Sequence, residues 1–170
     1  MLTIALPKGR IAEETLDKFE KAFGEKFIFE DRKLILEKAG FRFLNVRNQD
    51  VPTYVMHGAA DLGVVGLDVL EEKEYDLIKL LDLKLGRCKV AFGLRAGEQL
   101  NFNKSKITIA TKHEVIAKKY FEQKAMAVEI IKLYGSIELA PLVGLCDCIV
   151  DIVETGETMK QNGLEIGPTI

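Results

Sequence analysis

Short apolar runs alternate along the chain with segments whose apolar residues recur at helical spacing. The apolar run Leu2 to Leu6 is closed by Pro7 and Gly9, which is typical of a buried strand followed by a sharp turn. From Ile11 to Phe23 the apolar positions fall on one face of a helix and the charged positions on the other. The chain is therefore predicted to open with a strand, a loop and a helix.

The same alternation continues along the rest of the chain. Further strands are predicted at 34–36, 41–46, 62–65, 77–83, 89–94, 106–110, 128–133 and 149–153, the first two as a hairpin or meander. Helices are predicted from Asp50 to Gly58, from Asp68, and at 114–122, 137–143 and 158–162. The Asp50 carboxylate is expected to cap its helix, with Pro52 in the first turn. This order predicts an α/β fold with a largely parallel sheet in each of two lobes.

A polar loop and a weak internal repeat support the division into two lobes. The loop, Ala96 to Asn103, predicts a first lobe at 1–95 and a second at 96–165. Gly58-Ala59-Ala60-Asp61 and Gly144-Leu145-Cys146-Asp147 each precede an apolar strand that ends at a glycine turn. Matching lobes commonly hold a ligand between them. The alternative is that Gly-x-x-Asp only ends a helix before a strand.

Composition and charge exclude several classes of function. The 170 residues carry 24 Lys and Arg against 26 Asp and Glu, a net charge of −2, so no basic field indicates nucleic-acid or membrane binding. No apolar stretch approaches the ~20 residues of a spanning helix. Three cysteines and a start without a secretory signal predict a cytoplasmic protein with reduced thiols. Cys146-x-Cys148 lacks the second ligand pair of a zinc site, which favours packing.

The clearest chemical motif follows the strand predicted at 149–153. Thr155, Gly156 and Thr158 bring hydroxyls and free backbone N–H groups to the start of a helix, which suits a phosphate. Asp151 and Glu154 would repel a phosphate, but they can accept hydrogen bonds from the vicinal hydroxyls of a sugar or hold a magnesium ion. Together these residues indicate a sugar phosphate. A capped turn with solvated acids is the alternative.

Three other strand-to-helix turns carry candidate groups. Lys8-Gly9-Arg10 lies at the carboxyl end of the first strand, where its two cations suit a polyphosphate or are simply solvated. In Thr111-Lys112-His113, His113 either contacts a phosphate or is exposed. In Tyr134-Gly135-Ser136, Ser136 is expected to cap a helix. No Ser/His/Asp or Cys/His arrangement is readable, which argues against covalent acyl chemistry.

These motifs lie in blocks that resemble the ATP phosphoribosyltransferases. The blocks are Leu6 to Arg10, Asp50 to Gly66, Leu81 to Leu83, Gly86 to Cys88, Val128 to Leu133, Gly135 to Leu142, Asp151 to Gly156, and Asn162 to Leu164. They run in order through nearly the whole chain. Enzymes of that family open histidine biosynthesis by joining N1 of ATP to C1 of phosphoribosyl pyrophosphate, and they release pyrophosphate with magnesium present.

The resemblance implies two α/β lobes of the periplasmic-binding-protein type (type II-like), with the active site in the cleft. It implies that the 5-phosphate lies against Glu154, Thr155, Gly156, Glu157 and Thr158, and the ribose hydroxyls against Asp151 and Glu154. Lys8 and Arg10 would meet the pyrophosphate or the phosphates of ATP. Arg47, Asp68 and Ser136 are further cleft residues. Mg²⁺ would arrive with the substrate phosphates, and no residue is assigned to it.

The length is similar to that of the family's short form, which lacks the C-terminal regulatory domain. This implies a homo-oligomer that works with a separate histidyl-tRNA-synthetase-like regulatory subunit. Family chains continue beyond Asn162-Gly163-Leu164 with a helical segment, so 166–170 is expected to begin a return to the first lobe. One alternative is a non-catalytic two-lobed domain that binds a phosphosugar or nucleotide. Another is a phosphoribosyltransferase for a different base, which usually has two adjacent acids rather than the separated Asp151 and Glu154.

Overall fold

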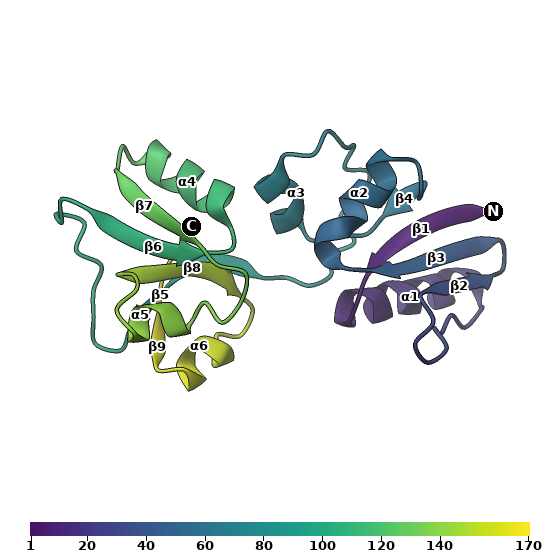
Figure 1. The fold of residues 1–170 in the computed structure, drawn as a ribbon. Helices are drawn as coiled ribbons and strands as arrows, with labels where there is room; N and C mark the ends of the chain where they lie inside the picture. The colour runs from purple at the N-terminus through teal and green to yellow at the C-terminus, as the bar shows by residue number, and fades with distance from the viewer. The chain divides into compact units, whose positions relative to one another are not determined.

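The computed structural model describes residues 1–170, which form two compact units, Met1–Gly86 and Arg87–Ile170 (Figure 1). Each unit has its own β-sheet. The division falls between Gly86 and Arg87 rather than near residue 96, because the strand that ends at Arg95 is hydrogen-bonded within the sheet of the second unit. No helix is both long enough and apolar enough to cross a membrane.

The first unit is built on a four-stranded sheet of order β2-β3-β1-β4. Its elements are β1 (Leu2–Pro7), α1 (Arg10–Phe23), β2 (Ile35–Lys38), β3 (Phe41–Val46), the 3-10 helix η1 (Asn48–Asp50), α2 (Val51–Met56), β4 (Leu62–Gly63) and α3 (Leu67–Lys73). β1 is parallel to β3 and β4, and β2 pairs antiparallel with β3. The predicted hairpin is thus confirmed, and the other two strand pairings are parallel, so this sheet is largely parallel as predicted.

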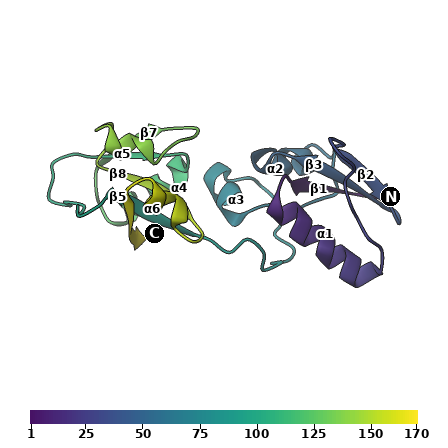
Figure 2. The ribbon, with the colours of Figure 1, turned by 90° about the horizontal axis from the view of Figure 1, so that it is seen from below.

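Alternating side chains of β1 supply two small cores on opposite faces of this sheet. Ile4 and Leu6 pack with Leu16 of α1 and with Phe43, whereas Ala5 packs with Val51 of α2. Successive residues of a strand point to opposite faces, so one buried strand serves both helices. Figure 2 shows α1 running beneath the strands of this unit.

The strand predicted at 77–83 is absent from the structure. The segment belongs to no helix or strand, and Ile78, Leu80 and Leu81 expose 85%, 73% and 78% of their surface. A short apolar run forms a strand only where another strand accepts its hydrogen bonds. Within residues 1–170 nothing pairs along this run or along the outer edge of β4.

The second unit is built on a five-stranded sheet of order β7-β6-β8-β5-β9. Its elements are β5 (Lys89–Arg95), β6 (Ile107–Thr111), α4 (Glu114–Gln123), β7 (Val128–Lys132), α5 (Leu139–Leu142), β8 (Cys148–Val153), α6 (Glu157–Gln161) and β9 (Leu164–Thr169). β6 is parallel to β7 and β8, whereas β5 is antiparallel to β8 and β9. Residues 166–170, expected to begin a return to the first lobe, lie here in and just after the edge strand β9.

Helices cover both faces of the second sheet. One core packs Ala117 and Phe121 of α4 against the sheet, and the other packs Ala140 of α5 and Met159 of α6 against the opposite face. Cys146 and Cys148 are buried free thiols, and burial raises the pKa of Cys148 to about 12. Such thiols are unreactive at neutral pH, so the expected packing role is confirmed.

The Gly-x-x-Asp repeat has the same structural role in both units. Asp61 donates its backbone N–H to the Thr3 carbonyl (2.8 Å) and accepts the Thr3 N–H on its carboxylate (2.7 Å). Asp147 makes the matching pair of bonds to Thr108, at 2.9 and 2.8 Å. In each unit the aspartate therefore fixes the start of one parallel strand against its neighbour. The repeat is a strand-registering turn, which supports the structural alternative for this motif.

Asp147 differs from its counterpart in carrying an ion pair with Lys104 at 2.5 Å. The hydrogen bond from Lys104 and that from the Thr108 backbone lower the pKa of Asp147 below its usual value. A carboxyl whose pKa is lowered by folding stabilises the protein above its unfolded pKa of about 3.9, and this contribution disappears as pH falls through the folded value. We expect Asp147→Asn to lower the free energy of unfolding at pH 7 by about 1 kcal/mol. Urea titrations should show the difference from the parent shrinking below about pH 4, and a constant difference would contradict this origin.

Two predicted side-chain caps are absent. Asp50 immediately precedes α2, with Pro52 in the first turn as expected, but its carboxylate makes no capping hydrogen bond because Asp50 already belongs to η1. Ser136 does not cap α5, which begins three residues later. Its backbone lies in the left-handed region at φ 49°.

Candidate functional site

Three turns of the second unit lie at one edge of its sheet. β6 is parallel to β7 and β8, so the carboxyl ends of all three strands point the same way. The turns that follow them begin at Lys112 after β6, at Leu133 after β7 and at Glu154 after β8. Two hydrogen bonds join these strand ends, from the Thr111 hydroxyl to the Val150 carbonyl (2.6 Å) and from Leu133 N–H to the Thr111 carbonyl (3.0 Å).

Asp151 is the buried acid of this edge. It is only 8% exposed, and its Oδ1 accepts the Ile152 N–H at 2.8 Å and lies 2.9 Å from Lys112 Nζ. His113 Nε2 lies 3.7 Å from the same oxygen, and His113 is 5% exposed. Of the two alternatives for His113, the solvent-exposed one is therefore wrong. Sequence reasoning noted the turn but did not link Lys112 to Asp151, since that link depends on the register of β6 against β8.

The loop expected to hold a phosphate runs from Glu154 into α6. Glu154, Thr155, Glu157 and Thr158 are exposed, and Gly156 is half-buried with φ 81° and ψ 0°. The Thr155 hydroxyl accepts the Glu157 N–H at 3.3 Å, and the Glu157 carboxylate accepts a bond from Gln161 at 3.0 Å. α6 has only five residues, so the loop's own N–H groups, rather than a helix dipole, are its means of holding an anion. Ser136 is exposed in the turn after β7.

The first unit presents cations at the corresponding edge of its sheet. Lys8 N–H donates to the Val46 carbonyl at 2.9 Å, which joins the turn after β1 to the end of β3, where Arg47 is exposed. Gly9 has φ 94° and ψ −153°, a conformation that essentially only glycine adopts, and this lets α1 begin at Arg10 directly after the strand. Arg10 Nε pairs with Glu14 at 3.2 Å. Because β4 is parallel to β1, Asp68, half-buried in the first turn of α3, follows the same edge.

The acids of the chain do not form a ready metal centre. No three His, Cys, Asp or Glu side chains gather closely enough to hold an ion. Asp151 and Glu154 are the acids beside the candidate phosphate loop, and such a pair suits a magnesium ion only where substrate phosphates supply the remaining ligands.

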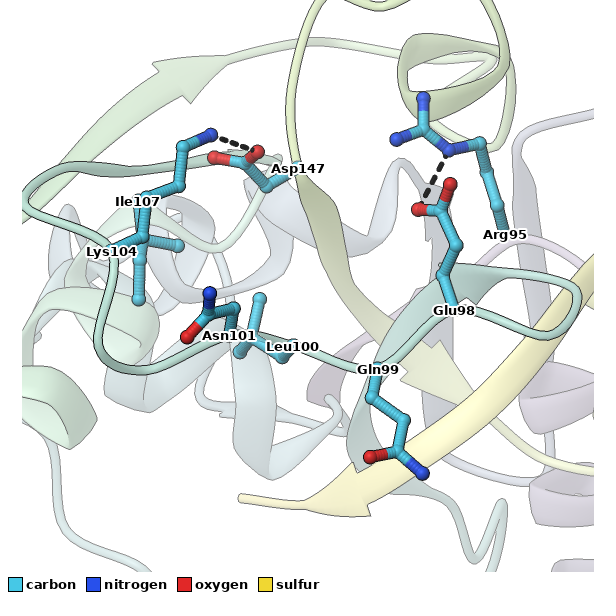
Figure 3. A pocket seen from close by; sticks show the side chains of 8 residues that line it. All are labelled: Arg95, Glu98, Gln99, Leu100, Asn101, Lys104, Ile107 and Asp147. Atoms are coloured by element: carbon cyan, nitrogen blue, oxygen red, sulfur yellow. Dashed lines mark hydrogen bonds and ion pairs between the residues drawn. The ribbon is translucent and has the colours of Figure 1, made fainter.

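A shallow hollow in the second unit lies at the other edge of the same sheet (Figure 3). Ile107 begins β6 and Asp147 precedes β8, so the hollow lies at the amino ends of these strands, away from the three turns. Lys104 is paired with Asp147, and Arg95 with Glu98 at 2.8 Å. With its charges already paired, the hollow does not compete with the carboxyl edge as a site for an anionic ligand.

Comparison with known proteins identifies the family. The family model of ATP phosphoribosyltransferase (HisG) matches residues 47–170. The ATP phosphoribosyltransferase of Wolinella succinogenes is 69% identical over 170 residues, which are 100% of this chain and 82% of that protein. The enzyme of that name from Sulfurovum sp. is 66% identical over the same span, again 82% of its length. The chain belongs to the ATP phosphoribosyltransferase family.

Solved structures agree with this family and its fold. The ATP phosphoribosyl transferase (HisG:HisZ) complex from Thermotoga maritima matches with a TM-score of 0.82 and 40% identity, covering 100% of this chain and 83% of that one. A periplasmic His/Glu/Gln/Arg/opine family-binding protein from Silicibacter pomeroyi matches with a TM-score of 0.60 at 10% identity, over 100% and 78%, which shows a shared fold alone. The predicted α/β fold of the periplasmic-binding-protein type and the predicted ATP phosphoribosyltransferase family are confirmed.

Proposed function

We propose that this chain transfers the phosphoribosyl group of phosphoribosyl pyrophosphate to N1 of ATP, giving phosphoribosyl-ATP and pyrophosphate, the first step of histidine biosynthesis. The observation that carries the proposal is the 69% identity, over every residue of the chain, to a protein named for this reaction. The carboxyl edge of the second unit supports it, because an acid with fixed orientation lies there beside a loop of exposed hydroxyl and N–H groups.

The second unit is assigned to the phosphoribosyl group. Thr155, Gly156 and Thr158, with the neighbouring Glu154 and Glu157, would cradle the 5-phosphate. The carboxylates of Asp151 and Glu154 would accept hydrogen bonds from the ribose hydroxyls. Ser136 lies in the turn that follows β7 at the same edge and is assigned to the same substrate. A sugar phosphate offers both kinds of group, whereas a phosphate alone would be repelled by these acids.

The cations of the first unit are assigned to the other charged groups of the reaction. A bond forms between N1 of ATP and C1 of the ribose while the bond from C1 to the pyrophosphate oxygen breaks, so negative charge builds on the departing pyrophosphate. Lys8 and Arg10 would stabilise that charge or bind the phosphates of ATP, with Arg47 and Asp68 as further substrate contacts. N1 of neutral adenine already carries a lone pair, so its attack needs no general base.

Mg²⁺ is proposed to arrive with the phosphates of the substrates. Because the chain itself gathers no cluster of three ligands, no step is assigned to the ion. A homo-oligomer with a histidyl-tRNA-synthetase-like regulatory subunit is also proposed, supported by the 40% identity to a protein solved as a HisG:HisZ complex. The expected compartment is the cytoplasm, in keeping with three free cysteines.

The test is formation of phosphoribosyl-ATP, followed by absorbance, from ATP, phosphoribosyl pyrophosphate and Mg²⁺. The chain is assayed alone and with a regulatory subunit of the proposed type, and calorimetry measures phosphoribosyl pyrophosphate binding in parallel. We expect product in at least the second assay. Binding without product in either assay would instead support a non-catalytic domain for a phosphosugar, and neither binding nor product would refute the proposal.

A further inference from the structure

The contact between Lys112 and Asp151 joins two turns of the candidate site and has no part in the assignments above. Lys112 directly follows β6, and Asp151 lies near the end of the adjacent parallel strand β8. Their charged atoms are 2.9 Å apart, with 36% of the lysine side chain and 11% of the aspartate side chain exposed. The lysine therefore lies between solvent and a nearly buried acid.

Lys112 also determines which oxygen of Asp151 is available. Oδ1 receives the Ile152 N–H and the Lys112 ammonium, and His113 Nε2 lies 3.7 Å away on the same oxygen. No hydrogen bond or ion pair of Asp151 in the structure uses Oδ2. A hydrogen bond and an ion pair on the same oxygen hold the carboxylate in one orientation, so Oδ2 is left as the acceptor for an incoming hydroxyl.

The charge of Lys112 is as important as its geometry. A carboxylate that is 8% exposed is costly to bury unless a cation compensates it. Asp151 also lies only a few residues before the loop assigned to a phosphate, where an uncompensated negative charge would repel the anionic substrate. A single ammonium 2.9 Å from Oδ1 reduces both penalties.

We propose that Lys112 is a positioning residue for phosphoribosyl pyrophosphate: it orients the Asp151 carboxylate toward the ribose hydroxyls and neutralises its charge beside the phosphate loop. The inference rests on the proposed function, since it concerns the same site. It predicts selective behaviour, because Asp151 is assigned to phosphoribosyl pyrophosphate and not to ATP. Loss of Lys112 should therefore weaken the binding of one substrate and not the other.

The first test compares Lys112→Gln with two matched variants. Calorimetry should show phosphoribosyl pyrophosphate binding weakened about tenfold, the order of magnitude expected when a nearly buried carboxylate loses its charged partner, while KM for ATP stays within about twofold. Lys112→Arg keeps the charge and should recover most of the affinity. The control is Lys106→Gln, which removes the lysine before the same strand, where it pairs with the exposed Glu129 at 2.9 Å. This variant should change neither the affinity for phosphoribosyl pyrophosphate nor the KM for ATP.

The second test is a double-mutant cycle with Asp151→Asn. If Lys112 acts through Asp151, then Lys112→Gln in the Asp151→Asn background should cost less than about a twofold further loss of binding. If the affinity losses of the two single variants instead multiply in the double variant, Lys112 acts on the substrate independently of Asp151 and the inference is overturned. Unchanged binding in Lys112→Gln alone, with an active parent, would overturn the inference but leave the proposed function standing. A parent chain that neither binds phosphoribosyl pyrophosphate nor forms product would overturn both.

Discussion

Removing the two cations after β1, in Lys8→Ala/Arg10→Ala, should lower kcat/KM for phosphoribosyl-ATP formation by about 10³-fold. One group that meets charge developing in a transition state contributes on the order of 10² to 10³ in rate, and two groups that act on the same charge contribute less than the product of their separate effects. The effect should fall mainly on kcat if the pair stabilises the departing pyrophosphate, and mainly on KM for ATP if it binds the phosphates of ATP. Steady-state assays with each substrate varied in turn distinguish the two roles. Wild-type kcat/KM in the double variant would refute both.

The two cations differ in how the structure holds their side chains. Lys8 makes no ion pair, and its side chain is exposed, whereas Arg10 is held by Glu14 on the next turn of α1. An exposed pair of this kind contributes about 0.5 kcal/mol or less, so its loss should leave the fold intact. The control is Lys18→Ala/Lys21→Ala, which removes two exposed cations further along the same helix. It changes net charge equally and should leave kcat/KM within about twofold, since long-range charge effects are screened.

Local sequence patterns predicted where strands and turns occur in this protein better than they predicted which strands pair with one another. The apolar run at 149–153 and the helical spacing at 11–23 both appear where expected, because burial on a sheet or helix face is written in neighbouring residues. The run at 77–83 has the same local character but no strand to pair with. β9 shows the reverse case, a segment without a local strand pattern that has a strand to pair with. Its Gly167 and Pro168 do not suggest a strand, yet an edge strand tolerates them while β5 supplies its hydrogen bonds.

The same limit applies to the candidate site. The turns after β1, β6, β7 and β8 were recognised from residues adjacent in sequence, and parallel pairing does bring the last three to one edge. The Lys112 contact with Asp151 was not recognised, because it requires the register of two strands separated by a helix, another strand and a second helix. The Arg10 contact with Glu14 could have been anticipated, since residues four apart on a helix face one another.

Gly156→Val should weaken phosphoribosyl pyrophosphate binding by about a hundredfold or more while the chain remains folded. The backbone of Gly156 lies at φ 81°, a region that a β-branched residue enters only at a cost of about 1–3 kcal/mol. A Cβ there would also overlap the Cδ1 of Ile166 in β9. The loop would have to rearrange. Its N–H groups, which are proposed to donate charge-assisted hydrogen bonds to the phosphate, would then no longer all point at the phosphate. Calorimetry measures the affinity and urea titration the stability.

A second glycine separates loss of the site from loss of stability. Gly163, just after α6, has a similar φ of 73°, and no atom lies within 4 Å of an added Cβ. Gly163→Val should therefore lose about as much stability from backbone strain, yet it should bind phosphoribosyl pyrophosphate within about twofold of the parent, because that turn is not assigned to the substrate. Adding Ile166→Ala to Gly156→Val should recover some stability by removing the overlap, but little affinity, since the altered backbone at residue 156 remains. Equal affinities for Gly156→Val and Gly163→Val would remove the loop from the phosphate site.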